Sequence, residues 1–72
     1  MNYQREKGIV VFLHTLSLYG FIRSEKDDSV FFHSSGLTES EFKDLREGNI
    51  VDYIRVDSPR GDRAIDVKIV AR

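Results

Sequence analysis

The chain has 72 residues, with 11 basic and 12 acidic side chains and a net charge of −1. This length predicts one small domain, and the near-neutral charge argues against a duplex-DNA binder that relies on neutralising phosphates. With no cysteine and only two histidines, the sequence offers neither a disulfide nor a zinc site. It has no apolar run of the roughly 20 residues that span a membrane, and its polar N-terminus is unlike a signal peptide. We therefore expect a single domain over residues 1–72 in a reducing cytoplasm, without cofactor or membrane.

The first half of the chain contains three predicted strands. Residues 7–14, 19–23 and 29–33 are rich in β-branched and aromatic side chains, as strands are. The charged residues 24–28 separate the second run from the third. Their length predicts a hairpin with a turn longer than the tightest two-residue type.

The second half begins with a break in the strand pattern at residues 34–36. Thr38 followed by Glu41 fits a capping box, and Phe42 and Leu45 share a helical face, so residues 38–47 predict a single helical turn within a long loop. Two more strands are predicted over residues 49–56 and 63–71, separated by a turn at residues 58–62. In the last strand, alternation places residues 64, 66, 68 and 70 on one face and residues 65, 67, 69 and 71 on the other.

Five short strands with a long connection between the third and the fourth predict an all-β fold. The pattern is typical of a five-stranded antiparallel Greek-key barrel of the oligonucleotide-binding type, the OB-fold. The apolar residues expected to fill it are Ile9, Val10, Leu13, Ile22, Val30, Phe32, Val51, Ile65, Val67 and Ile69.

Two aromatic runs lie in the second and third predicted strands. Successive side chains of a strand point to opposite faces, so Tyr19 shares a face with Phe21, and Phe31 shares one with His33. Pairing of the two strands would gather these four side chains on one surface, whereas Phe32 is out of phase and is predicted to lie in the core. Exposed rings are suited to stacking on nucleic-acid bases, because every base has a π-face. The pattern therefore predicts a surface that binds single strands.

These motifs resemble those of the cold-shock domain family. Residues 11–13 and 17–22 are similar to its first strand and RNP1-like motif, and residues 30–33 to its RNP2-like motif. The similarity continues through Phe42, residues 45–48, Val51, Tyr53 and residues 60–61, and so covers nearly the whole chain. The Phe-Phe-His run and the closing stretch at residues 63–69 look more like the modules of the eukaryotic Unr proteins than like the bacterial single-domain type.

The resemblance implies a protein that binds single-stranded RNA in preference to DNA, with a role in RNA chaperoning or in translational or post-transcriptional regulation. Carried over by position, it implies a nucleic-acid-binding set of Phe12, Tyr19, Phe21, Phe31, His33, Phe42 and Arg60. Two members have an alternative interpretation: Phe42 as the anchor of its helical turn, and Arg60 as a solvated turn residue. His14 has no such motif and is interpreted as a solvent-side or loop residue.

The sequence departs from the family pattern at the expected binding surface. Val11 replaces the usual lysine, Ser17 and Leu18 replace a lysine-glycine pair, and Ser34 replaces a second aromatic residue. The loss of two cations and one ring predicts weaker and less salt-sensitive binding. Leucine does not readily take the positive φ that glycine allows, so Leu18 also predicts a loop of different shape.

The sequence also bears on two functions other than nucleic-acid binding. Catalysis is disfavoured, because the serines lack a nucleophile elbow, the acidic residues are scattered among basic ones, and no glycine-rich phosphate loop occurs. A protein-interaction or scaffolding module remains the second hypothesis. It would use an apolar patch formed by Val11, Leu16 and Leu18, next to the aromatic residues.

Overall fold

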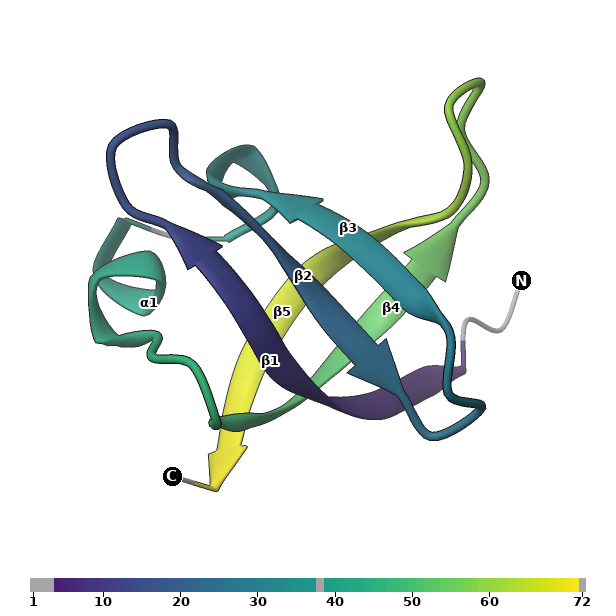
Figure 1. Cartoon of the computed structure of the whole chain (residues 1–72), viewed down its shortest axis with the longest axis horizontal. Coiled ribbons are helices and arrows are strands. Elements are labelled where there is room, and N and C mark those ends of the chain that lie inside the picture. The colour runs from purple at the N-terminus through teal and green to yellow at the C-terminus, as the bar shows by residue number, and fades with distance from the viewer. Residues whose placement is uncertain (1–3, 38, 72) are drawn as a thin grey trace.

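A closed barrel of five strands forms the fold of this chain (Figure 1). The computed structural model describes residues 4–37 and 39–71. The strand order is β1-β2-β3-β5-β4, and β1 pairs with β4 to close the barrel. The elements are β1 (Arg5–His14), β2 (Tyr19–Ser24), β3 (Ser29–His33), the 3-10 turn η1 (Ser34–Gly36), α1 (Glu39–Asp44), β4 (Ile50–Val56) and β5 (Arg63–Ala71). The predicted OB-type barrel is confirmed; its ladders are antiparallel except for the short parallel pairing of β3 with β5.

The barrel interior holds most of the apolar residues that the sequence predicts for it. The buried hydrophobic residues are Val10, Ile22, Val30, Phe32, Phe42, Leu45, Val51, Tyr53, Ala64 and Val67, with Leu13, Leu37 and Ile69 packed against them. The prediction for Ile9 is wrong: it is 47% exposed, because its neighbours Gly8 and Val10 are the residues of β1 that face inward. Ile65 is only half-buried.

A bulge in β5 overturns the simple alternation predicted for residues 63–71. Ala64 and Val67 are both buried although they are three residues apart. The register against β4 shifts between Ile65 and Lys68, and Asp66 there has a positive φ of 51°. The bulge inserts an extra residue and reverses the phase of the strand beyond it.

The connection between β3 and β4 contains the short helix that the sequence predicts, with narrower bounds. The prediction covered residues 38–47, whereas α1 spans Glu39–Asp44. The proposed capping residue Thr38 lies outside the described residues. Phe42, in α1, and Leu45, just after it, are both buried, so this connection contributes to the hydrophobic core. Across the described ranges, none of the helices has the length and apolar composition needed to span a membrane.

Candidate nucleic-acid interface

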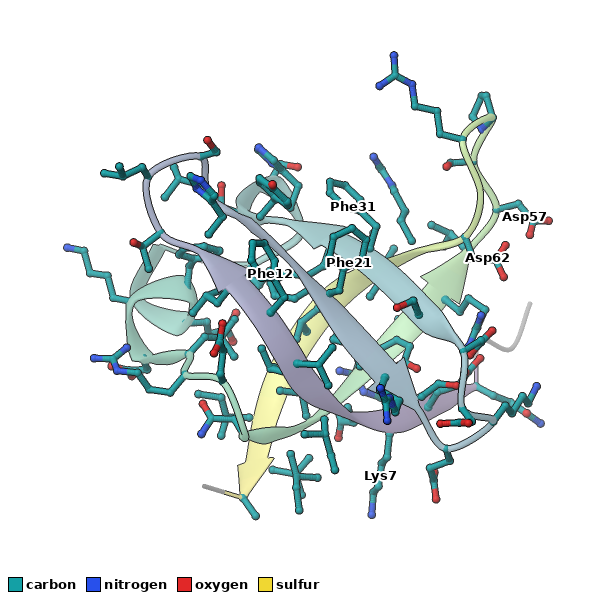
Figure 2. The ribbon with its side chains drawn as sticks, in the orientation of Figure 1. Lys7, Phe12, Phe21, Phe31, Asp57 and Asp62 are labelled. Atoms are coloured by element: carbon teal, nitrogen blue, oxygen red, sulfur yellow. The ribbon has the colours of Figure 1, made fainter. Side chains whose placement is uncertain are left out.

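Six side chains with aromatic rings cover the outer face of β1, β2 and β3, and we call this surface the ring face: Phe12, His14, Tyr19, Phe21, Phe31 and His33. Cross-strand pairing arranges them in two rows. The first row contains the three phenylalanines, one from each strand, and the second contains Tyr19 between the two histidines. Figure 2 shows the phenylalanines side by side across the three strands. Directly paired residues point to the same side of a sheet, so the six rings share one surface.

Five rings of this face are in contact with one another, and His33 lies beside them by strand register. In the phenylalanine row, the ring centroids are 6.2 Å apart between Phe12 and Phe21 and 5.7 Å apart between Phe21 and Phe31. The rows are joined by Tyr19, whose centroid lies 5.9 Å from that of Phe12 and 5.8 Å from that of Phe31. These separations are typical of aromatic pairs. Phe12 is 40% exposed and His33 is exposed, while the other members are half-buried. The result is a continuous platform that is open to solvent.

A bulge in β1 turns Phe12 onto the ring face. Val10 pairs with Ile22 but Phe12 pairs with Phe21, so Val11 is the extra residue. Hydrogen bonds from beyond α1 hold this segment: the Gly48 amide donates to the Val10 carbonyl at 2.8 Å, and the Leu13 amide donates to the Glu47 carboxylate at 3.1 Å. Both Val11 and Phe12 are therefore exposed, and Leu13 returns to the core.

His14 is a member of the ring face that the sequence interpretation missed. Its ring lies nearly parallel to that of Tyr19, with centroids 5.3 Å apart and an interplanar angle of 10°. Its Nδ1 accepts a hydrogen bond from the Ser17 amide at 3.0 Å. His14 does lie on the solvent side of the barrel, but in a strand and not in a loop, because it is the last residue of β1 and follows Phe12 by two positions on the same face.

The turn between β1 and β2 places Leu18 in the left-handed region, with a φ of 60°. We expected leucine to avoid a positive φ and to change the loop, and that premise is wrong. The Leu18 amide donates to the His14 carbonyl at 2.9 Å, and the Ser34 amide donates to the Leu18 carbonyl at 2.9 Å. These bonds hold the turn in a conformation that leucine adopts only at a cost of roughly 1–2 kcal/mol.

Packing in the barrel interior, beneath the two aromatic runs, explains why the residue between Tyr19 and Phe21 is a glycine. Phe32 is fully buried, as predicted, and pairs with Gly20 across the β2–β3 ladder. A Cβ atom on Gly20 would lie 2.7 Å from Cζ of Phe32. Only glycine therefore leaves room for the Phe32 ring beneath the ring face.

Two residues of the predicted binding set lie away from the ring face. Phe42 is only 8% exposed and belongs to the hydrophobic core, which favours its alternative role as an anchor of α1. Arg60 lies in the turn between β4 and β5 and is exposed. It lines a groove together with Phe21 and Phe31, so it borders the ring face without being part of it.

Two arginine clusters lie where β1 pairs with β4, and neither contains a residue of the ring face. Arg55 binds the carboxylates of Glu6, Asp28 and Asp62 at 2.9 to 3.1 Å. Hydrogen bonds from Arg55 lower the pKa of Glu6, and hydrogen bonds from Arg55 and Ser24 lower the pKa of Asp28 to about 2. The hydroxyl of the buried Tyr53 also donates to Glu6, at 3.4 Å.

Arg5 forms the second cluster, with Asp52 and Asp66 on neighbouring strands. Its guanidinium donates to the carboxylates of both residues at 2.8 Å. Asp66 is the residue of the β5 bulge, so Arg5 fixes the irregular part of that strand. These clusters connect strands far apart in sequence and have a structural role. Within residues 4–37 and 39–71, no group of three or more histidine, cysteine or acidic residues is suited to hold a metal ion.

Comparison with known proteins places this geometry in a family. The family model for the 'Cold-shock' DNA-binding domain matches residues 6–70. Cold shock-like protein CspC of Bacillus cereus is 36% identical over 61 residues, which cover 85% of this chain and 94% of that protein. A cold shock-like protein of Thermotoga maritima is 33% identical over 64 residues, covering 89% and 97%.

A solved structure has the same fold. The Drosophila Unr fragment CSD456 superposes with a TM-score of 0.78 at 21% identity, and the match covers 96% of this chain but only 28% of that one. At this identity the likeness shows the fold alone, so the closer similarity to the Unr modules stays a prediction. Members of the cold-shock domain family generally bind nucleic acids. The match over residues 6–70 and the identities of 36% and 33% show that this chain belongs to the cold-shock domain family.

Proposed function

We propose that this domain binds single-stranded nucleic acid, RNA in preference to DNA, by stacking bases on the ring face. The observation that carries the proposal is the grid of six rings on three adjacent strands, all at least partly open to solvent, of which all but His33 are in ring contact. Stacking of a base on an aromatic side chain contributes about 1–3 kcal/mol and tolerates any base. We therefore expect little sequence preference, and we infer a role in RNA chaperoning or in translational or post-transcriptional regulation.

The surface also predicts how strongly the domain binds. Val11 and Ser17, which stand where family members carry lysine, are both exposed, so the cations missing at these positions are missing from the surface itself. Each lost phosphate contact lowers the slope of log affinity against log salt concentration by roughly 0.7 on a single strand. A short oligonucleotide that covers only the ring face should therefore bind weakly and with a shallow salt dependence.

A panel of short single-stranded RNA and DNA oligonucleotides, titrated at two salt concentrations, tests the proposal. The chain has three tyrosines and no tryptophan, so quenching of tyrosine fluorescence reports on Tyr19 at the centre of its row. We expect saturable quenching by pyrimidine-rich strands, tighter for RNA than for DNA because the 2′-hydroxyl is available for recognition. Failure of every single strand to bind at low salt would contradict the proposal.

A second candidate function rests on exposed apolar residues beside the ring face. Leu16 is 90% exposed, Leu18 44% and Val11 42%. A contiguous patch of exposed apolar side chains marks a protein-interaction site, and these three residues are the candidates to form one. Under this alternative, the domain would self-associate or bind a protein through these residues and would have weak affinity for nucleic acid. A protein that stays monomeric at high concentration, with an RNA footprint confined to the ring face, would exclude it.

A further inference from the structure

Two grooves border the ring face on the side of β5. The first, which we call the loop groove, is lined by Phe21, Phe31 and residues 58–63. The second, the edge groove, runs between η1 and β5 and is lined by His33, residues 35–37, Glu41, residues 63–66 and Lys68. Arg63 lines both grooves. A single strand of nucleic acid that stacks on Phe31 and His33 therefore reaches Arg63 next, beyond the rings.

The register of β3 and β5 places Arg63 in line with the phenylalanine row. In this short parallel ladder Phe31 pairs with Arg63, and Phe32 pairs with Ala64. Phe32 and Ala64 are both buried, so the side chains of Phe31 and Arg63 point to the opposite, outer side. The position on β5 that lies next in line with the three rings is therefore occupied by the guanidinium group of Arg63. A guanidinium can stack on a base and can also bind a phosphate.

The cations of the edge groove are not engaged by carboxylates of the protein. Among the described residues, neither Arg63 nor Lys68 has an ion-pair or side-chain hydrogen-bond partner. The acidic residues next to them in sequence are already bound by other arginines, Asp62 by Arg55 at 3.1 Å and Asp66 by Arg5 at 2.8 Å.

The carboxylate of Glu41 also lines the edge groove. Asp66 is bound by Arg5, and Glu41 also interacts with another group of the protein, whereas Arg63 and Lys68 are bound by no carboxylate of the described residues. The side chains left to bind an incoming anion are therefore the two cations, which suits the groove to a phosphate backbone.

We propose that the edge groove binds the phosphate backbone of nucleotides that continue past His33, with Arg63 at its entrance and Lys68 farther along β5. The inference rests on the proposed function of the ring face and extends the site to longer strands. It also indicates where phosphate contacts are made in a domain that lacks lysine at positions 11 and 17. In this domain the phosphate contacts lie on the β5 side of the rings, whereas the lysines missing at positions 11 and 17 would have placed them on the β1 side.

The test compares two lengths of oligouridylate on the full chain, about four and about ten nucleotides, which span the range of OB-fold sites. In the double variant Arg63→Gln, Lys68→Gln, the slope of log affinity against log salt should fall by about 1.4 for the long oligonucleotide. The slope for the short one should stay unchanged. The matched control is the double variant Lys7→Gln, Lys26→Gln, which removes the same charge. Lys7 points away from the labelled phenylalanines in Figure 2, and neither lysine lines the two grooves.

The outcomes separate this inference from the proposed function. If the wild-type chain binds both oligonucleotides but the two double variants change the long-strand slope equally, the edge groove is not a backbone site and the ring face still stands. An equal loss for the short and the long oligonucleotide would likewise overturn the inference. If the wild-type chain binds neither, both proposals fail. Thermal unfolding of the variants checks that the exposed substitutions leave the fold intact.

Discussion

The rings of His14 and Tyr19 lie nearly parallel, with centroids 5.3 Å apart and 10° between their planes. His14 is at the end of β1, and Tyr19 begins β2 after a tight turn. The Ser17 amide closes that turn by donating to Nδ1 of the same histidine. One side chain thus extends the aromatic platform and fixes the turn beside it.

Two substitutions of His14 separate these roles. His14→Phe keeps a ring but removes the acceptor for the Ser17 amide, whereas His14→Asn keeps an acceptor but removes the ring. We expect the asparagine variant to bind a single-stranded oligouridylate more weakly by about 1–3 kcal/mol, and the phenylalanine variant to bind nearly as well as the wild type. Tyrosine fluorescence titration measures both affinities. The reverse order would show that His14 acts on binding only through the turn.

Phe21 lies at the centre of the phenylalanine row, so Phe21→Ala should remove a stacking platform. We expect a loss of about 1–3 kcal/mol in the free energy of binding to the same oligonucleotide. The control is Val70→Ala, because Val70 is 47% exposed on β5 and is not part of the ring face. Both are compared at a temperature where unfolding curves show the variants folded. Equal affinities of the two variants would mean that Phe21 does not stack on bases.

The positive φ of Leu18 predicts that a glycine variant at this position is more stable than an alanine variant. Alanine and glycine at this position both lose the leucine side chain, but only glycine is free of the strain. Leu18→Gly should therefore be more stable than Leu18→Ala by about 1 kcal/mol in urea unfolding. Leu16 is in the same turn, and its φ is not among the positive values of the described residues. At this position the alanine variant should therefore be more stable than the glycine variant. An alanine variant more stable than glycine at Leu18 would contradict this turn geometry.

The Arg55 cluster predicts how stability depends on pH. Because Arg55 lowers the pKa of Glu6 and of Asp28, these carboxylates stabilise the fold fully above about pH 4.5. Their contribution is lost as the pH falls through the folded-state pKa, which is about 2 for Asp28. Arg55→Met should remove this acid dependence and lower the free energy of unfolding at neutral pH by about 1–3 kcal/mol.

The control for Arg55 is an exposed ion pair between β2 and the turn that follows it. Arg23 lies 3.8 Å from Asp27, and their side chains are 63% and 84% exposed. Arg23→Met should change stability little, because exposed pairs are screened by solvent. Urea unfolding at neutral pH and near pH 3 measures both variants. An Arg55 variant that loses stability on acidification as steeply as the wild type would show that the cluster does not cause the pH dependence.

The strand positions and four of the rings followed from the sequence because they depend on local patterns. Tyr19 and Phe21, and likewise Phe31 and His33, alternate with buried residues, and no bulge interrupts β2 or β3. The same alternation could have placed His14 on this face, since it is two residues after Phe12. We missed it because it lies outside the motifs that resemble the family.

The bulges and the clusters did not follow from the sequence, because they depend on residues far apart in the chain. The bulge at Val11 is held by Gly48 and Glu47, beyond α1. The hydroxyl of the buried Tyr53 has its hydrogen-bond partner in Glu6, which is 47 residues away. Short-range alternation contains no information about such partners, so the phase of β5 was predicted wrongly. The error at Ile9 is different, because its exposure follows from alternation with the buried Gly8 and Val10.

The most direct test of the ring face is nuclear magnetic resonance of the isotope-labelled chain during titration with a single-stranded oligouridylate. We predict that the largest shifts occur in the aromatic signals of Phe12, His14, Tyr19, Phe21, Phe31 and His33. Signals of Ile50 and Lys7, which are outside the ring face, should stay in place at saturation. Shifts confined to Val11, Leu16 and Leu18, or no shift at saturating oligonucleotide, would contradict the account.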